Sequence, residues 1–140
     1  MASDAKLEAR ILTPEGEVYA GELFQLSTRT SVGEVGIRAR HAPMIARVVP
    51  AELRLHGAEG DSDVQRYATG EGWLEVFANK ATLLVAEATD PSELDVSSLK
   101  ERLDEAEQKL KDAEEGSAAE EQAKRDKLRA EAFIKIAEKS

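Results

Sequence analysis

GEGWLEVFANKATLLVAEA, residues 70–88, is the stretch that decides the fold of the first part of the chain. It contains two short runs, WLEVF and ATLLVA, that are rich in aromatic, β-branched and leucine residues. The turn ANK, residues 78–80, separates the two runs, and glycines stand just before the first one. Runs of this composition on either side of a short turn are typical of a β-hairpin. We therefore predict two paired strands here, with the glycines at strand junctions.

The same organisation extends back to the N-terminus. Short segments alternate apolar and polar residues, which gives each segment one face for a core and one for water. The apolar positions are Leu7, Ala9 and Ile11, then Phe24 and Leu26, then Leu53 and Leu55. Turn signals at residues 13–16 and 56–63 separate such segments. About eight or more short strands at this spacing predict a small antiparallel β-sandwich or flattened barrel.

Near Pro91 the sequence becomes helical. Asp95 or Ser92 is expected to cap the first helix, and Gly116 permits the chain to reverse after it. Apolar residues spaced by three and four form one stripe on this helix: Val96, Leu99, Leu103, Ala106, Leu110 and Ala113. A second helix is predicted over residues 118–138, with a stripe of mostly small residues: Ala119, Ala123, Ala130, Ile134 and Ala137. The chain is thus predicted to be a β + α protein, with a β-sandwich domain at residues 1–90 and an antiparallel two-helix hairpin at residues 91–140.

The predicted hairpin has a thin interface, because its second helix contributes mainly alanines and buries little apolar area. Leu128, Ala132 and Ile136 fall on the opposite side of that helix, at about 100° per residue, and form a second apolar face. This face requires a partner. The partner is either the β-sandwich or another protein, and the sequence leaves both alternatives open.

Composition narrows the function classes. The chain has 28 acidic residues against 19 Lys and Arg, a net charge of −9, which opposes binding to nucleic acid. It has no cysteine, which excludes disulfides and thiolate sites. Its N-terminus lacks the features of a secretory signal, and no run approaches the roughly 20 apolar residues that cross a bilayer, so we expect no membrane insertion. His41 and His56 have no partner at metal-ligand spacing, and no nucleophile or phosphate-loop motif occurs. We predict neither a metal site nor an enzyme.

The segment GEVGIRARHAP, residues 33–43, has the composition of a junction between a strand and a loop. Gly33 and Gly36 permit tight turns, while Val35 and Ile37 alternate into a core. Pro43 restricts the residue before it.

The order of these segments resembles the epsilon subunit of the F-type ATP synthase over the whole chain. The motifs that carry the resemblance are TPEG-x-V-Y-x-GE at residues 13–22, GE-x-G-I…HAP at residues 33–43, GW-LEV at residues 72–76 and the ANK turn followed by T-x-L-V-A-E. The resemblance implies a ten-stranded β-sandwich followed by a helical hairpin, and a non-catalytic subunit of the rotor.

In that family the sandwich binds the gamma subunit and the membrane c-ring, and so couples proton-driven rotation to ATP synthesis. The helical hairpin either folds against the sandwich or extends along gamma, and the extended form inhibits ATP hydrolysis. By resemblance, the c-ring contact is assigned to Glu34, Arg38, Arg40 and His41. The inhibitory contact with an acidic segment of the beta subunit is assigned to Lys124, Arg125, Lys127 and Arg129.

Some members of the family bind ATP at the hairpin through a pattern similar to Ile/Leu-Asp-x-x-Arg-Ala. Leu94 and Asp95 match its beginning, and Arg129 is a further candidate, but Ser98 and Leu99 replace the Arg-Ala pair. The missing arginine removes a phosphate-binding cation, and Asp95 has a simpler interpretation as a helix cap. We therefore expect no cofactor.

Two further departures bear on loop geometry. Ala39 and Arg40 replace the usual Pro-Gly before His-Ala-Pro, and Ala51 replaces the glycine after Pro50.

The alternative function is a stand-alone β-sandwich binding module with a nucleotide-responsive helical tail. Under the favoured interpretation, the lack of a transit peptide predicts a peripheral protein on the cytoplasmic side of a bacterial inner membrane.

Overall fold

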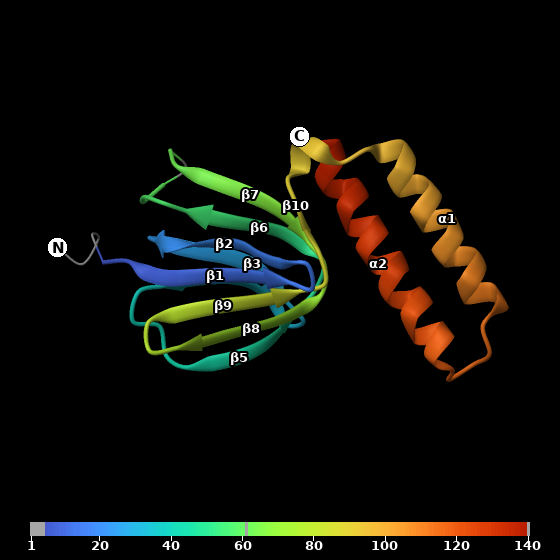
Figure 1. The fold of residues 1–140 in the computed structure, drawn as a ribbon, viewed down its shortest axis with the longest axis horizontal. Helices are drawn as coiled ribbons and strands as arrows, with labels where there is room; N and C mark the ends of the chain where they lie inside the picture. The colour runs from blue at the N-terminus through green and yellow to red at the C-terminus, as the bar shows by residue number, and fades with distance from the viewer. Residues whose placement is uncertain (1–4, 61, 140) are drawn as a thin grey trace. The chain divides into compact units, whose positions relative to one another are not determined.

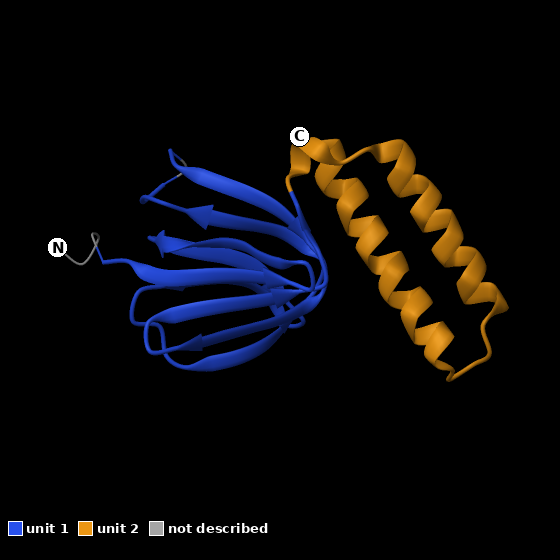
Figure 2. Ribbon diagram, in the orientation of Figure 1, with its two compact units in different colours: residues 1–89 blue, residues 90–140 orange. Residues whose placement is uncertain are grey.

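A computed structural model describes residues 5–60 and 62–139 (Figure 1). The chain divides into two compact units, Met1–Thr89 and Asp90–Ser140, and each is described here by itself (Figure 2). The first unit contains only strands among its described residues, and the second contains only helices. The predicted β-sandwich followed by two helices is confirmed.

The first unit is a ten-stranded sheet that folds over a common core as a β-sandwich. Its strands are β1 (Leu7–Thr13), β2 (Gly16–Leu23), β3 (Gln25–Thr30), β4 (Gly33–Arg38), β5 (Met44–Val48), β6 (Ala51–His56), β7 (Val64–Thr69), β8 (Gly72–Phe77), β9 (Lys80–Val85) and β10 (Ala88–Thr89). The stretch that decides the fold forms β8 and β9, which pair antiparallel from Gly72–Val85 to Phe77–Lys80. Ala78 and Asn79 form the turn, and both have positive φ, as in a type I′ hairpin turn.

The strands pair in the order β10-β7-β6-β3-β5-β8-β9-β1-β2, and β4 pairs with β3. All pairings are antiparallel except that of β1 with β9, which is parallel. Local alternation of residues does not carry this information, since a parallel pair joins strands that are far apart in the chain. A single bridge, Thr30 with Val48, joins β3 to β5.

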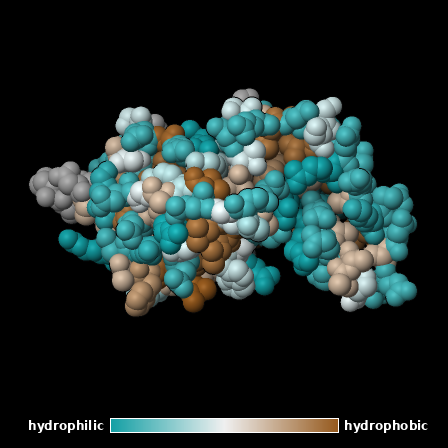
Figure 3. All heavy atoms as spheres, in the orientation of Figure 1, coloured by the Kyte–Doolittle hydropathy of each residue, from teal (hydrophilic) through white to brown (hydrophobic). Residues whose placement is uncertain are grey.

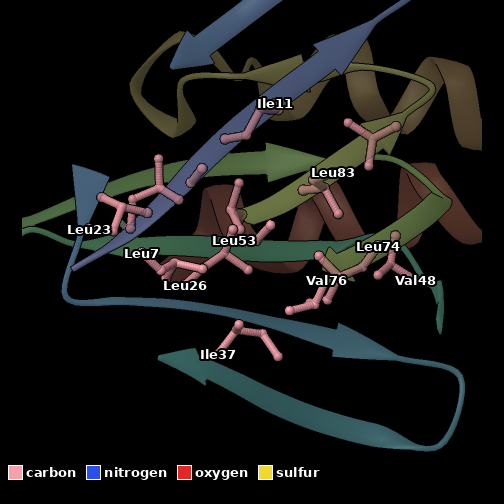
Figure 4. Close-up of a cluster of buried hydrophobic side chains, with 14 residues drawn as sticks. Leu7, Ile11, Leu23, Leu26, Ile37, Val48, Leu53, Leu74, Val76 and Leu83 are labelled. Atoms are coloured by element: carbon pink, nitrogen blue, oxygen red, sulfur yellow. The ribbon is translucent and has the colours of Figure 1, made fainter. Parts of the chain in front are cut away.

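The core lies between these strands (Figure 4). The residues expected to alternate inward do so, and each is nearly or fully buried: Leu7, Ala9, Ile11, Leu26, Leu53 and Leu55. Leu26 and Leu55 are directly opposite each other on β3 and β6. Fully burying a leucine or isoleucine side chain contributes about 1.5–3 kcal/mol, so this cluster dominates the stability of the unit.

The two glycines of the 33–43 segment have different roles. Gly33 has φ 131° and supports the turn between β3 and β4, as expected. Gly36 does not form a turn but lies within β4. A Cβ atom at this position would lie 2.8 Å from Nε2 of Gln25 on the neighbouring strand. The absence of a side chain at Gly36 therefore makes room for Gln25.

The second unit begins with a 3₁₀ helix, η2 (Pro91–Glu93), followed by α1 (Val96–Asp112) and α2 (Ala118–Lys139). Asp95 caps α1: its carboxylate accepts from the Ser97 backbone N–H at 3.1 Å and from the Ser98 hydroxyl at 2.9 Å. Ser92 lies in η2, where the Asp90 carboxylate accepts its N–H at 2.9 Å and its hydroxyl at 2.8 Å. These two bonds lower the pKa of Asp90. Gly116, with φ 79°, permits the reversal between the helices.

The buried faces of the hairpin differ in part from the predicted stripes. Leu99 and Ala106 on α1 are buried, as are Ala123 and Ala130 on α2. The prediction missed Phe133, which is fully buried with the Arg102 guanidinium 6.0 Å from its ring centre. Phe133 lies only about 40° around the helix from Ala137, within the same sector. The interface is therefore less thin than a row of alanines would make it.

One other expectation for α2 was wrong, and the second apolar face is only partly exposed. Ala119 is exposed rather than packed, because it lies in the first turn of the helix. Ile136, assigned to a second apolar face, is buried, whereas Leu128 of that face is 59% exposed.

Candidate partner-binding site

The four residues predicted to contact the c-ring do not lie together. Glu34 is beside the β3–β4 turn, where its carboxylate lies 3.5 Å from the Arg29 guanidinium. Val32, two residues before Glu34, is 96% exposed at the tip of this turn. Arg38 ends the same strand, four residues further on, which is about 13 Å at 3.3 Å per residue. Arg38, Arg40 and His41 therefore share one segment, and Glu34 belongs to the opposite end of the sandwich.

Arg38 is held by two neighbours. Its Nε donates to Oε1 of Gln25 at 2.8 Å, and its guanidinium lies 4.8 Å from the centre of the Phe24 ring. Gln25 in turn donates from Nε2 to the Ser27 hydroxyl at 2.6 Å. Because the arginine is fixed on both sides, its charge has a defined position on the surface.

Arg40 has a left-handed backbone, with φ 65°. Its backbone N–H donates to Oδ1 of Asn79 in the β8–β9 turn at 2.8 Å. Asn79 also donates from Nδ2 to the Lys6 carbonyl at 3.0 Å. The side chain of Asn79 thus joins the loop at Arg40 to the residues just before β1.

His41 closes the same loop. Its backbone N–H donates to the Arg38 carbonyl at 3.2 Å, and Nδ1 lies 2.7 Å from the Ala42 carbonyl. Since a carbonyl only accepts, Nδ1 carries a proton in this contact.

An exposed apolar face beside this loop was missed by the sequence analysis. Ile45 is 72% exposed, Phe77 65%, and Trp73 and Leu84 48% each. They lie on β5, β8 and β9, where Trp73 is directly opposite both Arg47 and Leu84, and Ile45 is opposite Glu75. We call these four residues the outer apolar face. Figure 3 shows apolar surface over the part of the sandwich in which Figure 1 places β8 and β9.

A groove of about 450 Å³ marks one side of the outer apolar face, lined by residues 43–45 and 75–77. Arg47 lies over the Trp73 ring at 5.3 Å, a cation–π contact. The signal for this face is present in the sequence. WLEVF and ATLLVA carry large apolar residues at positions that alternate to both sides of a strand, whereas a sheet with one solvated side has polar residues there.

The four basic residues assigned to an inhibitory contact lie on α2 but not on one side of it. Lys124 lies 3.7 Å from the Glu120 carboxylate, and Lys127 lies 3.9 Å from Glu107 on α1. Arg125 donates to Oε1 of Gln122 at 2.9 Å. At about 100° per residue, the two lysines point roughly 150° away from Arg125 and Arg129. One flat surface cannot contact all four while the hairpin is closed.

The three nucleotide-site candidates are also separated. The Asp95 carboxylate is engaged by the N-terminus of α1 and flanks Leu94. The contacts of Lys127 with Glu107 and of Arg102 with Phe133 fix the register of the helices. They place Arg129 level with about residue 105, some 15 Å from Asp95 at 1.5 Å per residue. A cavity of about 190 Å³ between the helices is lined by other residues: Arg102, Glu105, Ala106, Lys109 and Asp126.

Other site types receive little support. Within residues 5–60 and 62–139, no cluster of three or more His, Asp or Glu side chains could hold a metal ion. Over the same residues, neither helix is both long and apolar enough to span a bilayer. Burial raises the pKa of Tyr19, and the nearby Tyr67 and Asp63 raise it further. Tyr19 is not among the predicted binding residues.

Comparison with known proteins identifies the family. Residues 6–91 match the family model described as "ATP synthase, Delta/Epsilon chain, beta-sandwich domain". The "ATP synthase epsilon chain" of Persephonella marina is 38% identical over 128 residues, which is 91% of this chain and 93% of the relative. The chain belongs to the ATP synthase epsilon chain family. The corresponding protein of Sulfurihydrogenibium sp. is 31% identical over 127 residues, again 91% of this chain and 93% of the relative.

Membership of the epsilon chain family confirms the resemblance drawn from the sequence motifs, and with it a non-catalytic subunit. The alignments with the two relatives extend over 91% of the chain and so include helical sequence beyond residue 91. The helical hairpin is therefore part of the family likeness.

Two solved structures share the epsilon-type fold at low sequence identity. One is a chain of the Euglena gracilis mitochondrial ATP synthase assembly of OSCP, F1 and c-ring, with TM-score 0.73 and 21% identity over 92% of this chain and 79% of that chain. The other is a chain of the Tetrahymena thermophila mitochondrial ATP synthase central stalk and c-ring, with TM-score 0.61 and 18% identity over 93% and 95%.

Proposed function

We propose that this chain is a rotor subunit in the central stalk of ATP synthase, where it couples rotation of the c-ring to ATP synthesis in the catalytic head. Its family supports this role, and the solved structures of similar fold come from central-stalk and c-ring assemblies. It acts as a peripheral protein on the cytoplasmic side of a bacterial membrane.

The outer apolar face is the observation that carries the proposal. Within residues 5–60 and 62–139, four of the six exposed large apolar side chains lie on it, together with a groove. Contiguous exposed apolar surface on a soluble unit marks a site of protein association. A subunit that remains in a complex requires such a face, and we assign it to the gamma subunit. The loop after β4 borders the groove at Pro43, so Arg38, Arg40 and His41 are assigned to the rim of the groove.

The c-ring contact is assigned to the β3–β4 turn. Val32 offers an apolar tip, and Glu34 a carboxylate whose ion pair with Arg29 is exposed and therefore weak. This assignment divides the four residues first given to the ring into one ring residue, Glu34, and three at the gamma side.

Crosslinking tests the division. Because the chain has no cysteine, a single introduced cysteine is unique. In the assembled enzyme, Glu34→Cys is expected to crosslink to the c-ring and Arg40→Cys to gamma. Crosslinks from Arg40→Cys to the ring alone would restore the original assignment. Purification of a tagged chain from its source membranes without any ATP synthase subunit would instead favour a stand-alone binding module.

We assign inhibition of ATP hydrolysis to the helical hairpin through Lys124, Arg125, Lys127 and Arg129 and an acidic segment of the beta subunit. The lysines lie on one side of α2 and the arginines on the other, so two double variants separate their roles. Lys124→Ala with Lys127→Ala leaves the arginine side unchanged, and Arg125→Ala with Arg129→Ala does the reverse. The double variant that removes the residues in contact with beta is expected to weaken inhibition more than the other one. The difference is expected to be largest at low salt, where charges attract most strongly. Unchanged inhibition in both double variants and in the quadruple variant would refute the assignment.

No ATP site is proposed for Leu94, Asp95 and Arg129, because the closed hairpin keeps Arg129 far from Asp95. Calorimetric titration of the full chain with ATP is expected to show no saturable heat. Saturable binding at millimolar concentration or below would contradict this.

A further inference from the structure

We propose that Asn79 is a positioning residue that fixes the Arg38–His41 loop for partner binding. Its side chain contacts two other segments of the chain: Oδ1 accepts from the Arg40 N–H at 2.8 Å, and Nδ2 donates to the Lys6 carbonyl at 3.0 Å. Its backbone carbonyl accepts from the Glu8 N–H at 3.1 Å. One residue thus ties the β8–β9 turn to the start of β1 and to the loop after β4.

The need for this contact lies in the backbone of Arg40. With φ 65°, Arg40 is in the left-handed region, which non-glycine residues occupy in only a few per cent of cases. Within the loop, a turn bond joins the His41 N–H to the Arg38 carbonyl and places Arg40 at the third position of the turn, where a side chain other than that of glycine or asparagine is disfavoured at positive φ. The hydrogen bond from Arg40 to Asn79 forms only when the loop has its folded geometry, so it selects that geometry.

Asn79 is itself well placed for this task. At φ 62° it occupies the second central position of a type I′ turn, where asparagine is one of the residues that tolerate positive φ. Its backbone is therefore fixed by the β8–β9 hairpin and does not depend on Arg40. The hairpin acts as the rigid support, and the loop is the supported part.

The consequence concerns the partner surface. The supported loop carries His41 and leads into residues 43–45, which form one wall of the groove next to the outer apolar face. A loop held in its bound geometry loses less entropy on association, and so binds more tightly. This last step rests on the proposed function, since it takes gamma as the partner at the groove.

The experiment uses five full-length chains: the parent, Asn79→Gly, Arg40→Gly, the variant that combines these two substitutions, and the control Ala78→Gly. Glycine at position 79 accepts the turn geometry, so the hairpin is preserved while both side-chain bonds are lost. Ala78→Gly is the matched control, because residue 78 is the other left-handed residue of the same turn and its side chain makes no hydrogen bond. Thermal unfolding of each variant verifies that it is folded.

The first measurement is amide hydrogen exchange at Arg40 in the isolated chain. Loss of one protein hydrogen bond is expected to speed exchange roughly fivefold to tenfold in Asn79→Gly and to leave it unchanged in Ala78→Gly. Equal exchange rates in the parent and Asn79→Gly would overturn the proposed clamp, whatever the partner.

The second measurement is the affinity of each chain for the isolated gamma subunit. Binding is monitored through the fluorescence of Trp73, the only tryptophan in this chain. Asn79→Gly is expected to weaken binding about fivefold to tenfold in the parent and less than twofold in the Arg40→Gly background, because glycine adopts positive φ without support. Equal losses in both backgrounds would overturn the positioning role. Faster exchange at Arg40 with no binding of the parent chain to gamma would preserve the clamp and refute the proposed function.

Discussion

Thr28 places a hydroxyl group in the core of the sandwich, where none of the described residues offers Oγ1 a hydrogen-bond partner. The residue is 3% exposed and lies on β3 opposite Val35. A buried polar group without a partner costs about 1–3 kcal/mol. We therefore predict that Thr28→Val raises the free energy of unfolding by about 1 kcal/mol. Chemical denaturation monitored by far-UV circular dichroism measures the change.

Thr30 provides the matched control for this substitution. It lies two residues further along the same strand and is also buried, but its hydroxyl donates to the Gly33 carbonyl at 2.8 Å and accepts from the Val32 N–H at 3.2 Å. Thr30→Val is expected to lower the free energy of unfolding by about 1–2 kcal/mol. A loss of stability in Thr28→Val similar to that in Thr30→Val would show that the Thr28 hydroxyl has a partner.

At the scale of single elements, the start of α1 depends on one side chain. The Asp95 carboxylate accepts the Ser97 N–H, which has no partner within the helix. Asp95→Ala is expected to destabilise the helical hairpin by about 1 kcal/mol, as loss of an N-cap does in other helices. Asp104→Ala, in the exposed middle of the same helix, removes an equal charge and is expected to change stability by less than about 0.5 kcal/mol. Equal effects of the two substitutions on helix unfolding would argue against the cap.

The hairpin interface depends on Phe133 more than on any alanine. Truncating a fully buried phenylalanine costs about 3–5 kcal/mol, a large share of the stability of a two-helix unit. Phe133→Ala is therefore expected to open the hairpin, seen as a loss of helical signal at lower temperature. Leu128→Ala on the same helix removes an exposed side chain and is expected to have little effect. An unchanged helical transition in Phe133→Ala would mean that the alanines alone suffice.

The sequence predicts features that depend on neighbouring residues, and it misses features that depend on residues far apart in the chain. The inward positions of Leu7, Ile11 and Leu53 follow from alternation within one strand, so local pattern is enough. The parallel pairing of β1 with β9 and the hydrogen bond from Arg40 to Asn79 join residues far apart in the chain, which no local pattern reports. The outer apolar face has a local signal, but its extent depends on which strands become neighbours.

At the scale of the whole molecule, charge and apolar surface are distributed differently. The chain carries a net charge of −9, so only a basic partner would be attracted to it by overall charge. The outer apolar face instead offers Ile45 and Phe77 beside a groove, with Arg47 and Glu75 of opposite charge on the same strands. Binding there is expected to depend mainly on apolar contact and only weakly on salt.

The outer apolar face also allows binding to be separated from stability. Ile45→Ser with Phe77→Ser replaces exposed side chains, so the free energy of unfolding is expected to change by less than about 1 kcal/mol in total. Association with gamma is expected to weaken at least tenfold, since large apolar residues at the centre of an interface contribute most of its energy. Val32→Ser removes an even more exposed apolar side chain from the β3–β4 turn and is expected to leave the gamma affinity within threefold. Equal affinities for the double variant and the parent, measured by titration of gamma at two salt concentrations, would assign the outer apolar face to another partner.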